Sequence, residues 1–286
     1  MDDLIFEQTR LGMVLKQSQS NAAFQTVPET WQDQPVTGIG AYAFANQTQL
    51  KRVTLPESIT SIGNHAFYNC TNLEQLTLLK GVDSVGNGVL TNCRNLHQIS
   101  VHGLSHIRGI VTDFLNEFVL TVTMEQGNTL RLLFPAYDYA FEEAPCRGFR
   151  SISYGSGSFY RTCVLRKEID FIEYDRCFRR AIREDEPHTV QDIACYRLLY
   201  PHQLREPAKQ AYLDYLCDHA SEVVSAVIKQ RSIPRLELLI QQEILSRDVL
   251  EAAIAQASDI DFPEGVSLLM DHRLSRFGHL RKRFSL

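Results

Sequence analysis

The sequence predicts an α+β protein, in which a short β-solenoid is followed by a mixed segment and then by an α-helical hairpin region. Three observations predict this fold class: a 23-residue repeat, a pair of strand patterns around a turn, and a long stretch of helical periodicity. The three repeats are expected at 36–58, 59–81 and 82–104. The expected segments are a repeat domain at 1–115, a mixed β and aromatic segment at 116–168, and a helical domain at 169–286.

The repeat keeps its register at many positions. Each unit contains a Leu-x-x-Val-x-Leu type of pattern, which is typical of a short strand with its apolar side chains in the core. Each unit also has a glycine at one fixed position, where we expect a tight turn with positive φ, and an asparagine at another, whose side chain we expect to bond free backbone groups. These residues are Gly40, Gly63 and Gly86, and Asn46, Asn69 and Asn92. Because one unit cannot cover its own apolar face, the units must stack.

The motifs VTGIGAYAF at 36–44 and LPESITSIGNHAFYNC at 55–70 resemble BspA-like leucine-rich repeats. The resemblance covers about residues 13–103, roughly the first third of the chain. It implies a small curved solenoid that displays its strand face to a partner. It also brings to mind the cell-surface adhesion proteins in which such repeats occur, in bacteria and some protists. A fourth unit begins at Leu104 and then loses the spacing, as expected of a terminal repeat that caps the stack.

The middle segment opens with a predicted hairpin. Strand patterns at 118–124 and 130–134 flank a turn at 125–128. A cluster of aromatic residues follows, which we interpret as core or as a domain interface, with a partner-binding patch as the alternative. The cluster comprises Tyr137, Tyr139, Phe141, Phe149, Tyr154, Phe159 and Tyr160. The Gly-Ser-Gly-Ser stretch at 155–158 lacks the lysine of a phosphate-binding loop, which favours a plain turn.

Helical periodicity begins near Ile169. The first helix is expected to present Ile169, Ile172, Cys177, Phe178, Ala181 and Ile182 on one face. A capping box at 189–192 is expected to start the next helix, and Pro207, Pro234 and Pro263 to open later ones. The pairs recur every 27–32 residues and resemble ankyrin-like helical hairpins, with a simple bundle as the alternative. The basic end at 273–286 is expected to be solvated. The alternatives are contact with an acidic partner, RNA or a membrane surface.

Composition excludes several classes of protein. The hydrophobic fraction of 44% and charged fraction of 22% exclude wholesale disorder, and the net charge of −5 argues against nucleic acid as the main partner. Seven cysteines without a C-x-x-C pair predict reduced thiols. The acidic start has no signal-peptide pattern, and no apolar run is long enough to span a membrane. We therefore expect a cytoplasmic protein, with a cell-surface location as the alternative if an export signal lies outside this sequence.

Two candidate chemical sites also have ordinary structural explanations. His102 and His106 are four residues apart, with Asp113 following, but they flank the end of a predicted strand with a glycine between them, which disfavours a shared metal on one helix face. Cys163 is a possible nucleophile, but no local motif activates it, which favours a buried structural thiol. The sequence therefore predicts no catalytic, cofactor-binding or metal site, and it leaves the oligomeric state open.

The function predicted from these features is that of a scaffold for protein–protein interaction. The strand face is expected to bind a protein or peptide through polar columns, namely Arg52, Gln75 and Gln98, and Thr54, Thr77 and Ser100. Lys51, Glu74 and His97 border these columns. One alternative is a cell-surface adhesin whose export signal is missing. A further alternative is an enzyme whose site lies in the aromatic middle segment.

Overall fold

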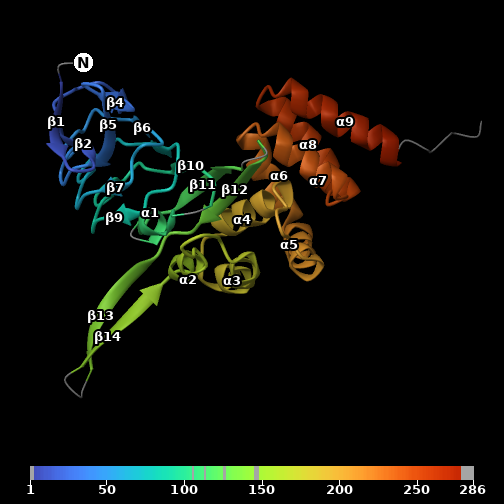
Figure 1. The fold of residues 1–286 in the computed structure, drawn as a ribbon. Helices are drawn as coiled ribbons and strands as arrows, with labels where there is room; N and C mark the ends of the chain where they lie inside the picture. The colour runs from blue at the N-terminus through green and yellow to red at the C-terminus, as the bar shows by residue number, and fades with distance from the viewer. Residues whose placement is uncertain (1–2, 105, 113, 125–126, 145–147, 278–286) are drawn as a thin grey trace, which may run out of the picture. The chain divides into compact units, whose positions relative to one another are not determined.

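The computed structural model describes residues 3–104, 106–112, 114–124, 127–144 and 148–277, apart from the side chains of 139–153. The chain forms two compact units, Met1–Asp185 and Glu186–Leu286. Strands dominate the first unit and helices make up the second (Figure 1), so the predicted α+β class is confirmed. Both predicted segment boundaries, at 115/116 and 168/169, fall inside the first unit.

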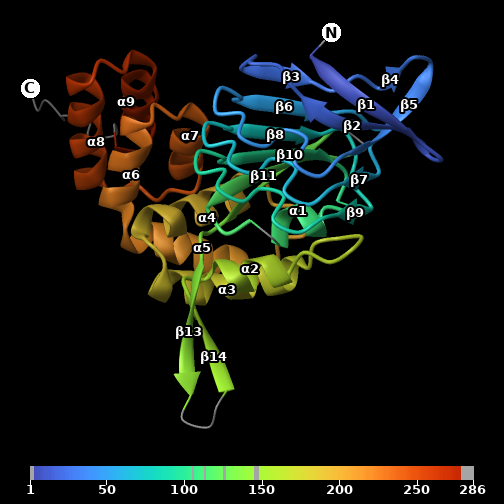
Figure 2. The same cartoon turned by 90° about the vertical axis from the view of Figure 1, so that its left-hand side faces the viewer.

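The first sheet is a ladder with the order β12-β11-β10-β8-β6-β3. The strands β3, β6, β8, β10 and β11 run parallel, and β12 pairs with β11 in the antiparallel sense. Figure 2 shows the ladder from the side. Its strands are β3 (Phe24–Thr26), β6 (Arg52–Leu55), β8 (Gln75–Leu78), β10 (Gln98–His102), β11 (Phe118–Thr123) and β12 (Thr129–Phe134). The strands predicted in the three repeats are therefore confirmed.

A second sheet has the order β1-β2-β5-β7-β9, with β4 paired to β5. Successive repeats add one short parallel strand to this sheet and one to the ladder, which gives a solenoid with two strand faces. The strands are β1 (Leu4–Thr9), β2 (Gly12–Ser18), β4 (Thr30–Trp31), β5 (Gln34–Ile39), β7 (Ser61–Ile62) and β9 (Ser84–Val85).

The solenoid core repeats with the sequence. Phe44 and Phe67 stack with their ring centroids 4.9 Å apart. The thiols of Cys70 and Cys93 donate to the carbonyls of Phe44 and Phe67 at 3.0 and 3.1 Å. Burial raises the pKa of Cys70 to about 11 and that of Cys93 to about 12. Both thiols are therefore small core residues, as the sequence predicts.

The prediction that the repeated glycines supply positive φ was wrong. The positive φ angles lie at two other positions of the repeat. One is held by Asn46 (64°), Asn69 (60°) and Asn92 (62°), because asparagine tolerates the left-handed conformation, and the other by Tyr42 (59°), His65 (54°) and Gly88 (62°). The glycines instead permit close stacking of turns, since a Cβ on Gly63 would lie 2.5 Å from the backbone nitrogen of Ala41.

The asparagine side chains also differ from the prediction, because they bond to one another. Asn69 Nδ2 donates to Asn46 Oδ1 at 2.8 Å, and Asn92 Nδ2 donates to Asn69 Oδ1. We call these three residues the asparagine ladder. An amide carries both a donor and an acceptor, so identical residues at every turn can form a continuous chain of hydrogen bonds.

The array extends beyond the three predicted repeats at both ends. β3 adds a rung before β6, and β11 adds a rung after β10. Gln98 pairs with Val119, an offset of 21 residues in place of the repeat's 23, and the short helix α1 (Arg108–Thr112) lies in that turn. The predicted hairpin is confirmed as β11 and β12, and it forms the end of the solenoid ladder.

The remainder of the first unit comprises a hairpin and two helices. β13 (Asp138–Ala144) and β14 (Gly148–Tyr154) form a two-stranded sheet of their own (Figure 1), followed by α2 (Gly157–Thr162) and α3 (Phe171–Glu184). Arg161 on α2 is 2% exposed, and its guanidinium donates to four backbone carbonyls. These belong to Phe114, Asn116, Pro135 and Gly157, so one side chain ties together the end of the solenoid and the start of the helices.

The predicted apolar face of α3 was partly wrong. Ile172 and Ile182 are 37% and 45% exposed, whereas Tyr174 and Phe178 are buried. The cause lies at Ile169, which precedes the helix and forms a β-bridge with Val164, so a face counted from it is rotated. Asp170 caps the helix by accepting from two backbone N–H groups.

The second unit consists of helices that form hairpins. They are α4 (Pro187–Leu199), α5 (Glu206–Asp218), α6 (Ala220–Lys229), α7 (Ile233–Gln241), α8 (Arg247–Asp259) and α9 (Pro263–Phe277). Pro207 and Pro234 lie in the first turns of α5 and α7, and Pro263 begins α9, as predicted. The predicted capping box was wrong, because α4 begins at Pro187 and Thr189 lies inside its first turn.

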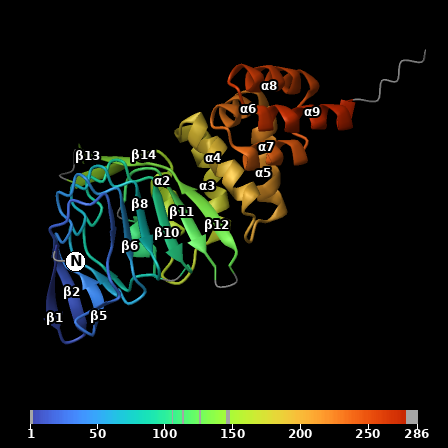
Figure 3. The same ribbon diagram turned by 90° about the horizontal axis from the view of Figure 1, so that it is seen from above.

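The last two hairpins stack helix upon helix. α6 contacts α8 and α7 contacts α9 (Figure 3). Gln256 Nε2 donates to Ser225 Oγ at 2.8 Å, and Arg231 donates to the carbonyl of Ile260 at 2.6 Å. This stacking agrees with the predicted helical hairpins more closely than with a simple bundle, while ankyrin geometry stays a prediction.

The basic end is partly described. Arg273 pairs with Glu251 at 3.2 Å and Arg276 pairs with Glu243 at 3.1 Å, so these two arginines bind within the unit. The remaining stretch, 278–286, lies outside the described residues.

Candidate functional site

The predicted polar columns lie side by side on the ladder. The strand register pairs Arg52 with Gln75 and Gln75 with Gln98. It likewise pairs Thr54 with Thr77 and Thr77 with Ser100. We call these six residues the polar strip.

The alternation of each strand turns the polar strip outward. On β6, Val53 and Leu55 are fully buried, whereas Arg52 is exposed and Thr54 is half-buried. β8 and β10 repeat this pattern with their own apolar residues inside. Because side chains alternate across a strand, burial of one set fixes the outward direction of the other.

Hydrogen bonds order the side chains within the polar strip. Gln75 Nε2 donates to Thr77 Oγ1 at 3.3 Å, and Gln98 Nε2 donates to Ser100 Oγ at the same distance. Each glutamine is thereby held along its own strand. This leaves the strip as a regular surface of amide and hydroxyl groups.

Charged and aromatic groups lie at the border of the polar strip. Lys51 and Glu74 form an exposed ion pair at 3.5 Å, as expected for two of the predicted border residues. At one end, the guanidinium carbon of Arg52 lies 4.9 Å from the ring centroid of Phe24, a cation–π contact. Phe24 is 61% exposed, so it offers apolar area beside the polar columns.

The same columns continue onto β3 and β11, which lie outside the three predicted repeats. Phe24 and Thr26 on β3 precede Arg52 and Thr54, and Val119 and Thr121 on β11 follow Gln98 and Ser100. The Phe-Gln-Thr alternation was visible in the sequence, but it carries none of the glycine and asparagine marks of the repeat. β11 was not recognised as part of the columns because its offset from β10 is 21 residues in place of 23.

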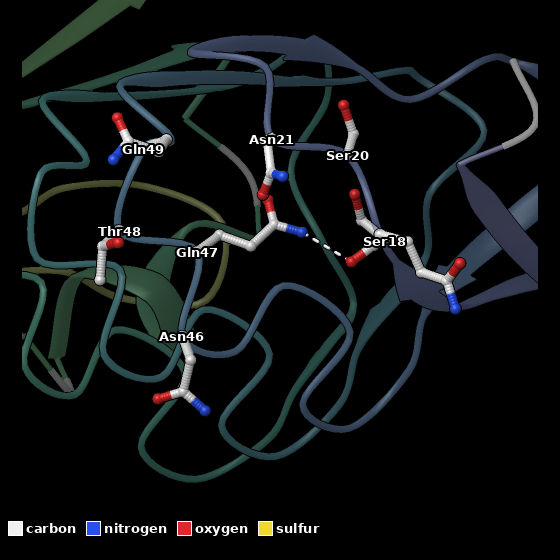
Figure 4. Close-up of a pocket in the computed structure, with 8 residues that line it drawn as sticks. Ser18, Ser20, Asn21, Asn46, Gln47, Thr48 and Gln49 are labelled. Atoms are coloured by element: carbon white, nitrogen blue, oxygen red, sulfur yellow. Dashed lines mark hydrogen bonds between the residues drawn. The ribbon is translucent and has the colours of Figure 1, made fainter.

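A small polar cavity lies at the first turn of the asparagine ladder (Figure 4). It has a volume of about 200 Å³ and is lined by hydroxyl and amide side chains. Gln47 Nε2 donates to the carbonyl of Ser18 at 2.8 Å, and its Oε1 accepts from Gln25. These bonds fix Gln47 as part of the wall, which gives the cavity a structural explanation.

The Gly-Ser loop at 155–158 binds the side-chain carboxylate of Asp185. The backbone N–H of Ser156 donates to Asp185 Oδ1 at 2.8 Å, and Ser156 Oγ donates to Asp185 Oδ2. Burial raises the pKa of Asp185, and the two bonds from Ser156 oppose that shift. The loop therefore fastens the end of α3 to the start of α2.

The candidate metal residues do not converge in the part of the chain that the structure describes. His106 pairs with Asp83, its Nδ1 lying 2.8 Å from Oδ1, while His102 lies exposed at the end of β10. Asp113 lies outside the described residues. Among those residues there is no group of three His, Cys, Asp or Glu side chains placed to hold a metal ion.

The aromatic cluster divides into buried and exposed members. Tyr160 is fully buried and packs edge-on against Tyr174 at 4.6 Å, as expected for core. Tyr154 and Phe159 are 55% and 38% exposed. The side chains of Tyr139, Phe141 and Phe149 lie outside the described set, so the predicted contact patch stays a prediction.

Cys163 has the environment of a buried thiol. It is 2% exposed and its Sγ donates to the carbonyl of Phe159 at 3.4 Å. A hydrogen bond to Cys177 and burial both raise its pKa, which disfavours the thiolate that a nucleophile needs. This agrees with the structural role predicted for it.

Comparisons with known proteins bear on the repeat array. Residues 21–128 match the family model described as BspA type leucine rich repeat region, in 6 copies. The match begins before and ends after the three predicted repeats, in agreement with the additional rungs β3 and β11. No curated protein matches the chain.

Solved structures of three bacterial proteins are similar to part of the chain. A leucine rich cell surface protein from Faecalibacterium prausnitzii A2-165 is 22% identical, over 39% of this chain and 34% of that one, with a TM-score of 0.32. A leucine-rich repeat protein from Bacteroides capillosus ATCC 29799 is 26% identical, over 35% and 78%, with a TM-score of 0.32. A leucine-rich repeat protein of T. pallidum is 18% identical, over 43% and 81%, with a TM-score of 0.26.

The chain thus spans 34% of the length of the Faecalibacterium protein. None of the helices in the described residues combines the length and the apolar character that a membrane crossing requires. The family match and the stacked 23-residue units fall in the same part of the first unit. Residues 21–128 of this chain are therefore a leucine-rich repeat region of the BspA type.

Proposed function

We propose that the protein is an interaction scaffold that binds a protein or peptide through the polar strip. The observation that carries the proposal is the register of β6, β8 and β10, which aligns like side chains into two outward columns. Parallel strands are about 4.8 Å apart, so each column repeats its hydrogen-bonding groups at that interval. A regular strip of this kind suits a partner that itself carries regularly spaced polar groups.

The chemistry of the polar strip favours a polypeptide partner over a lipid. Amides and hydroxyls both donate and accept, so they can satisfy the backbone and polar side chains of a partner. Phe24 and Arg52 add an aromatic and a guanidinium at one end, and these are the groups that often dominate binding energy at protein interfaces. The polar strip therefore offers hydrogen-bonding groups along its length, and the contact between Phe24 and Arg52 adds an aromatic ring at one end.

A triple substitution tests the proposal. We expect Arg52→Ala, Gln75→Ala and Gln98→Ala together to remove partner capture from an extract of the source cell, with little change in melting temperature. Exposed side chains outside the polar strip supply the matched control, Glu57→Ala, Lys80→Ala and Thr91→Ala. Capture that survives the first triple change, or that falls equally in the second, contradicts the assignment of the strip as the binding site.

The cellular location is a separate question with its own test. The sequence predicts a cytoplasmic scaffold, and the alternative is a cell-surface adhesin. The similar Faecalibacterium protein is named a cell surface protein, but it matches only part of this chain. Fractionation of the source cells with an antibody against the protein separates the two: we expect the protein in the cytosolic fraction, and recovery from the envelope or the medium establishes the adhesin instead.

A further inference from the structure

Another cavity of the first unit lies where the last full repeat meets α1. It has a volume of about 320 Å³. Three separate stretches of the chain line it, namely Val82 and Asp83 just before β9, residues of the stretch 106–112 around α1, and Arg166 between α2 and α3. α1 lies beside β9 (Figure 2), which brings the first two stretches together. None of the lining residues belongs to the polar strip, so this cavity is separate from the proposed binding surface.

Backbone hydrogen bonds hold the walls of the cavity in place. The N–H of Val82 donates to the carbonyl of His106 at 3.1 Å, and the N–H of His106 donates to the carbonyl of Arg166 at 2.7 Å. The turn that carries Arg166 is itself closed, because the N–H of Leu165 donates to the carbonyl of Glu168 at 2.9 Å. The backbone of all three stretches is therefore fixed before a ligand binds, which reduces the entropy that binding would cost.

The lining of the cavity carries more positive than negative charge. Arg108 and Arg166 are both exposed, and neither guanidinium has a hydrogen-bond or ion-pair partner among the described residues. The one carboxylate in the lining belongs to Asp83, and its Oδ1 lies 2.8 Å from Nδ1 of His106. That carboxylate is already engaged, and two guanidinium groups outnumber it. The cavity therefore favours an anion.

We propose that this cavity binds a phosphate monoester group. A guanidinium presents its N–H donors as a planar fork that bonds two oxygens at once. One fork satisfies the two oxygens of a carboxylate. A phosphate monoester has three terminal oxygens and a charge of about −1.5 to −2, so it can bond to Arg108 and Arg166 together. Small-molecule sites have volumes of roughly 300–1,000 Å³, and this cavity lies at the lower end, which suits a phosphate with a small attached group.

The experiment is isothermal titration calorimetry on the full chain, in a phosphate-free buffer of low ionic strength. The probes are glycerol phosphate, which represents a small phosphorylated metabolite, and O-phosphoserine, which represents a phosphorylated side chain. We expect both to bind saturably at one site per chain. Glycerol and serine should give no saturable signal, and acetate should bind at least about tenfold more weakly, because one guanidinium satisfies it.

Substitutions of single arginines test the location of the site. Arg108→Ala and Arg166→Ala should each weaken binding of both probes about tenfold, because each removes charge-assisted hydrogen bonds. Arg166→Lys keeps the charge and loses the planar fork, so it should also weaken binding. The matched controls are Arg10→Ala and Arg183→Ala, which remove the same charge from exposed positions outside the cavity and should change the affinity less than about twofold.

The possible results separate cleanly. Circular dichroism checks that each variant is folded, and the exposure of all four arginines makes loss of the fold unexpected. Absence of saturable binding to the unsubstituted chain, or unchanged affinity in both Arg108→Ala and Arg166→Ala, would overturn the proposal. So would an equal loss in the control variants, which would indicate a general attraction of phosphate to exposed arginines. Tighter binding of O-phosphoserine supports the proposal with a phosphorylated side chain as the ligand, and tighter binding of glycerol phosphate supports it with a small metabolite.

Discussion

Arg161 offers the sharpest test of how the first unit is held together. Its guanidinium is buried, and it donates to the carbonyls of Phe114, Pro135, Gly157 and Asn116 at 2.7, 2.5, 3.0 and 2.7 Å. These carbonyls lie at the end of the solenoid and at the start of α2, so one side chain joins both. Arg161→Met keeps the apolar stem and removes all four donors.

The expected loss of unfolding free energy is the difference between the lost hydrogen bonds and the avoided cost of burying a charge. A hydrogen bond to a charged donor contributes about 1.5–3 kcal/mol, so four of them contribute roughly 6–12 kcal/mol. Against this, burial lowers the pKa of Arg161 from 12.5 to about 10, which corresponds to a cost of about 3 kcal/mol for the charged form. The neutral methionine avoids that cost but leaves four carbonyls without their donor. We expect the free energy of unfolding to fall by about 4 kcal/mol.

Urea unfolding followed by tryptophan fluorescence measures this loss. Trp31 is the single tryptophan of the chain and stacks on Phe6 in the first unit, so its emission reports on that unit. Far-ultraviolet circular dichroism follows the helical unit in parallel. The control is Arg94→Met, an exposed arginine, for which we expect a change within about 0.5 kcal/mol. A loss below about 1 kcal/mol for Arg161→Met would show that the four bonds do not anchor the unit.

Three further predictions concern the solenoid turns and the loop before α2. Gly63→Ala should cost about 3 kcal/mol in urea unfolding, because its Cβ would lie 2.5 Å from backbone, whereas Gly40→Ala, with its nearest atom at 3.0 Å, should cost less than about 1 kcal/mol. Asn69→Ala should cost about 2 kcal/mol through lost hydrogen bonds and a positive φ, and Asn69→Gly, which relieves the φ strain, should recover about half; equal losses would refute the contribution of φ. The raised pKa of Asp185 means that the folded state binds a proton at higher pH than the unfolded state, so stability should rise as pH falls through the folded pKa. In Asp185→Asn that part of the pH–stability curve, measured by urea titration between about pH 4 and 7, should become flat.

The repeat was predictable because its marks recur at a fixed interval. Gly63 and Asn69 each have counterparts 23 residues away on both sides, and the strands follow from the alternation between them. Their roles were harder to assign. The sequence shows that both residue types recur, but only the backbone shows that Asn69 takes the positive φ while Gly63 makes room for Ala41.

The ends of the array were not predictable in the same way. β3 lacks the recurring marks, and β11 follows β10 at a different spacing because α1 occupies the turn between them. The columns of the polar strip were predictable, because residues that are 23 apart in the sequence lie side by side on neighbouring strands. The contact between Phe24 and Arg52 depends on the unmarked strand β3, so it could not be predicted.

Long-range contacts outside the array left no local pattern. Arg161 resembles an ordinary surface arginine in the sequence, and its carbonyl partners lie up to 47 residues away. The starts of α5, α7 and α9 were predictable by contrast, because proline acts on the backbone at its own position.

The antiparallel strands β1 and β12 limit where the repeat array can gain or lose units. β1 closes one sheet at its first strand, and β12 closes the other at its last, so a parallel repeat cannot be added outside them in the same pattern. Between these ends the units are interchangeable, since each meets its neighbours through the same contacts. Duplication of the segment 59–81 would reproduce those contacts, whereas a duplication that is not a whole number of units would break them. Related arrays should therefore differ by whole repeat units that were inserted or lost between the two antiparallel strands, and both of these strands should be retained.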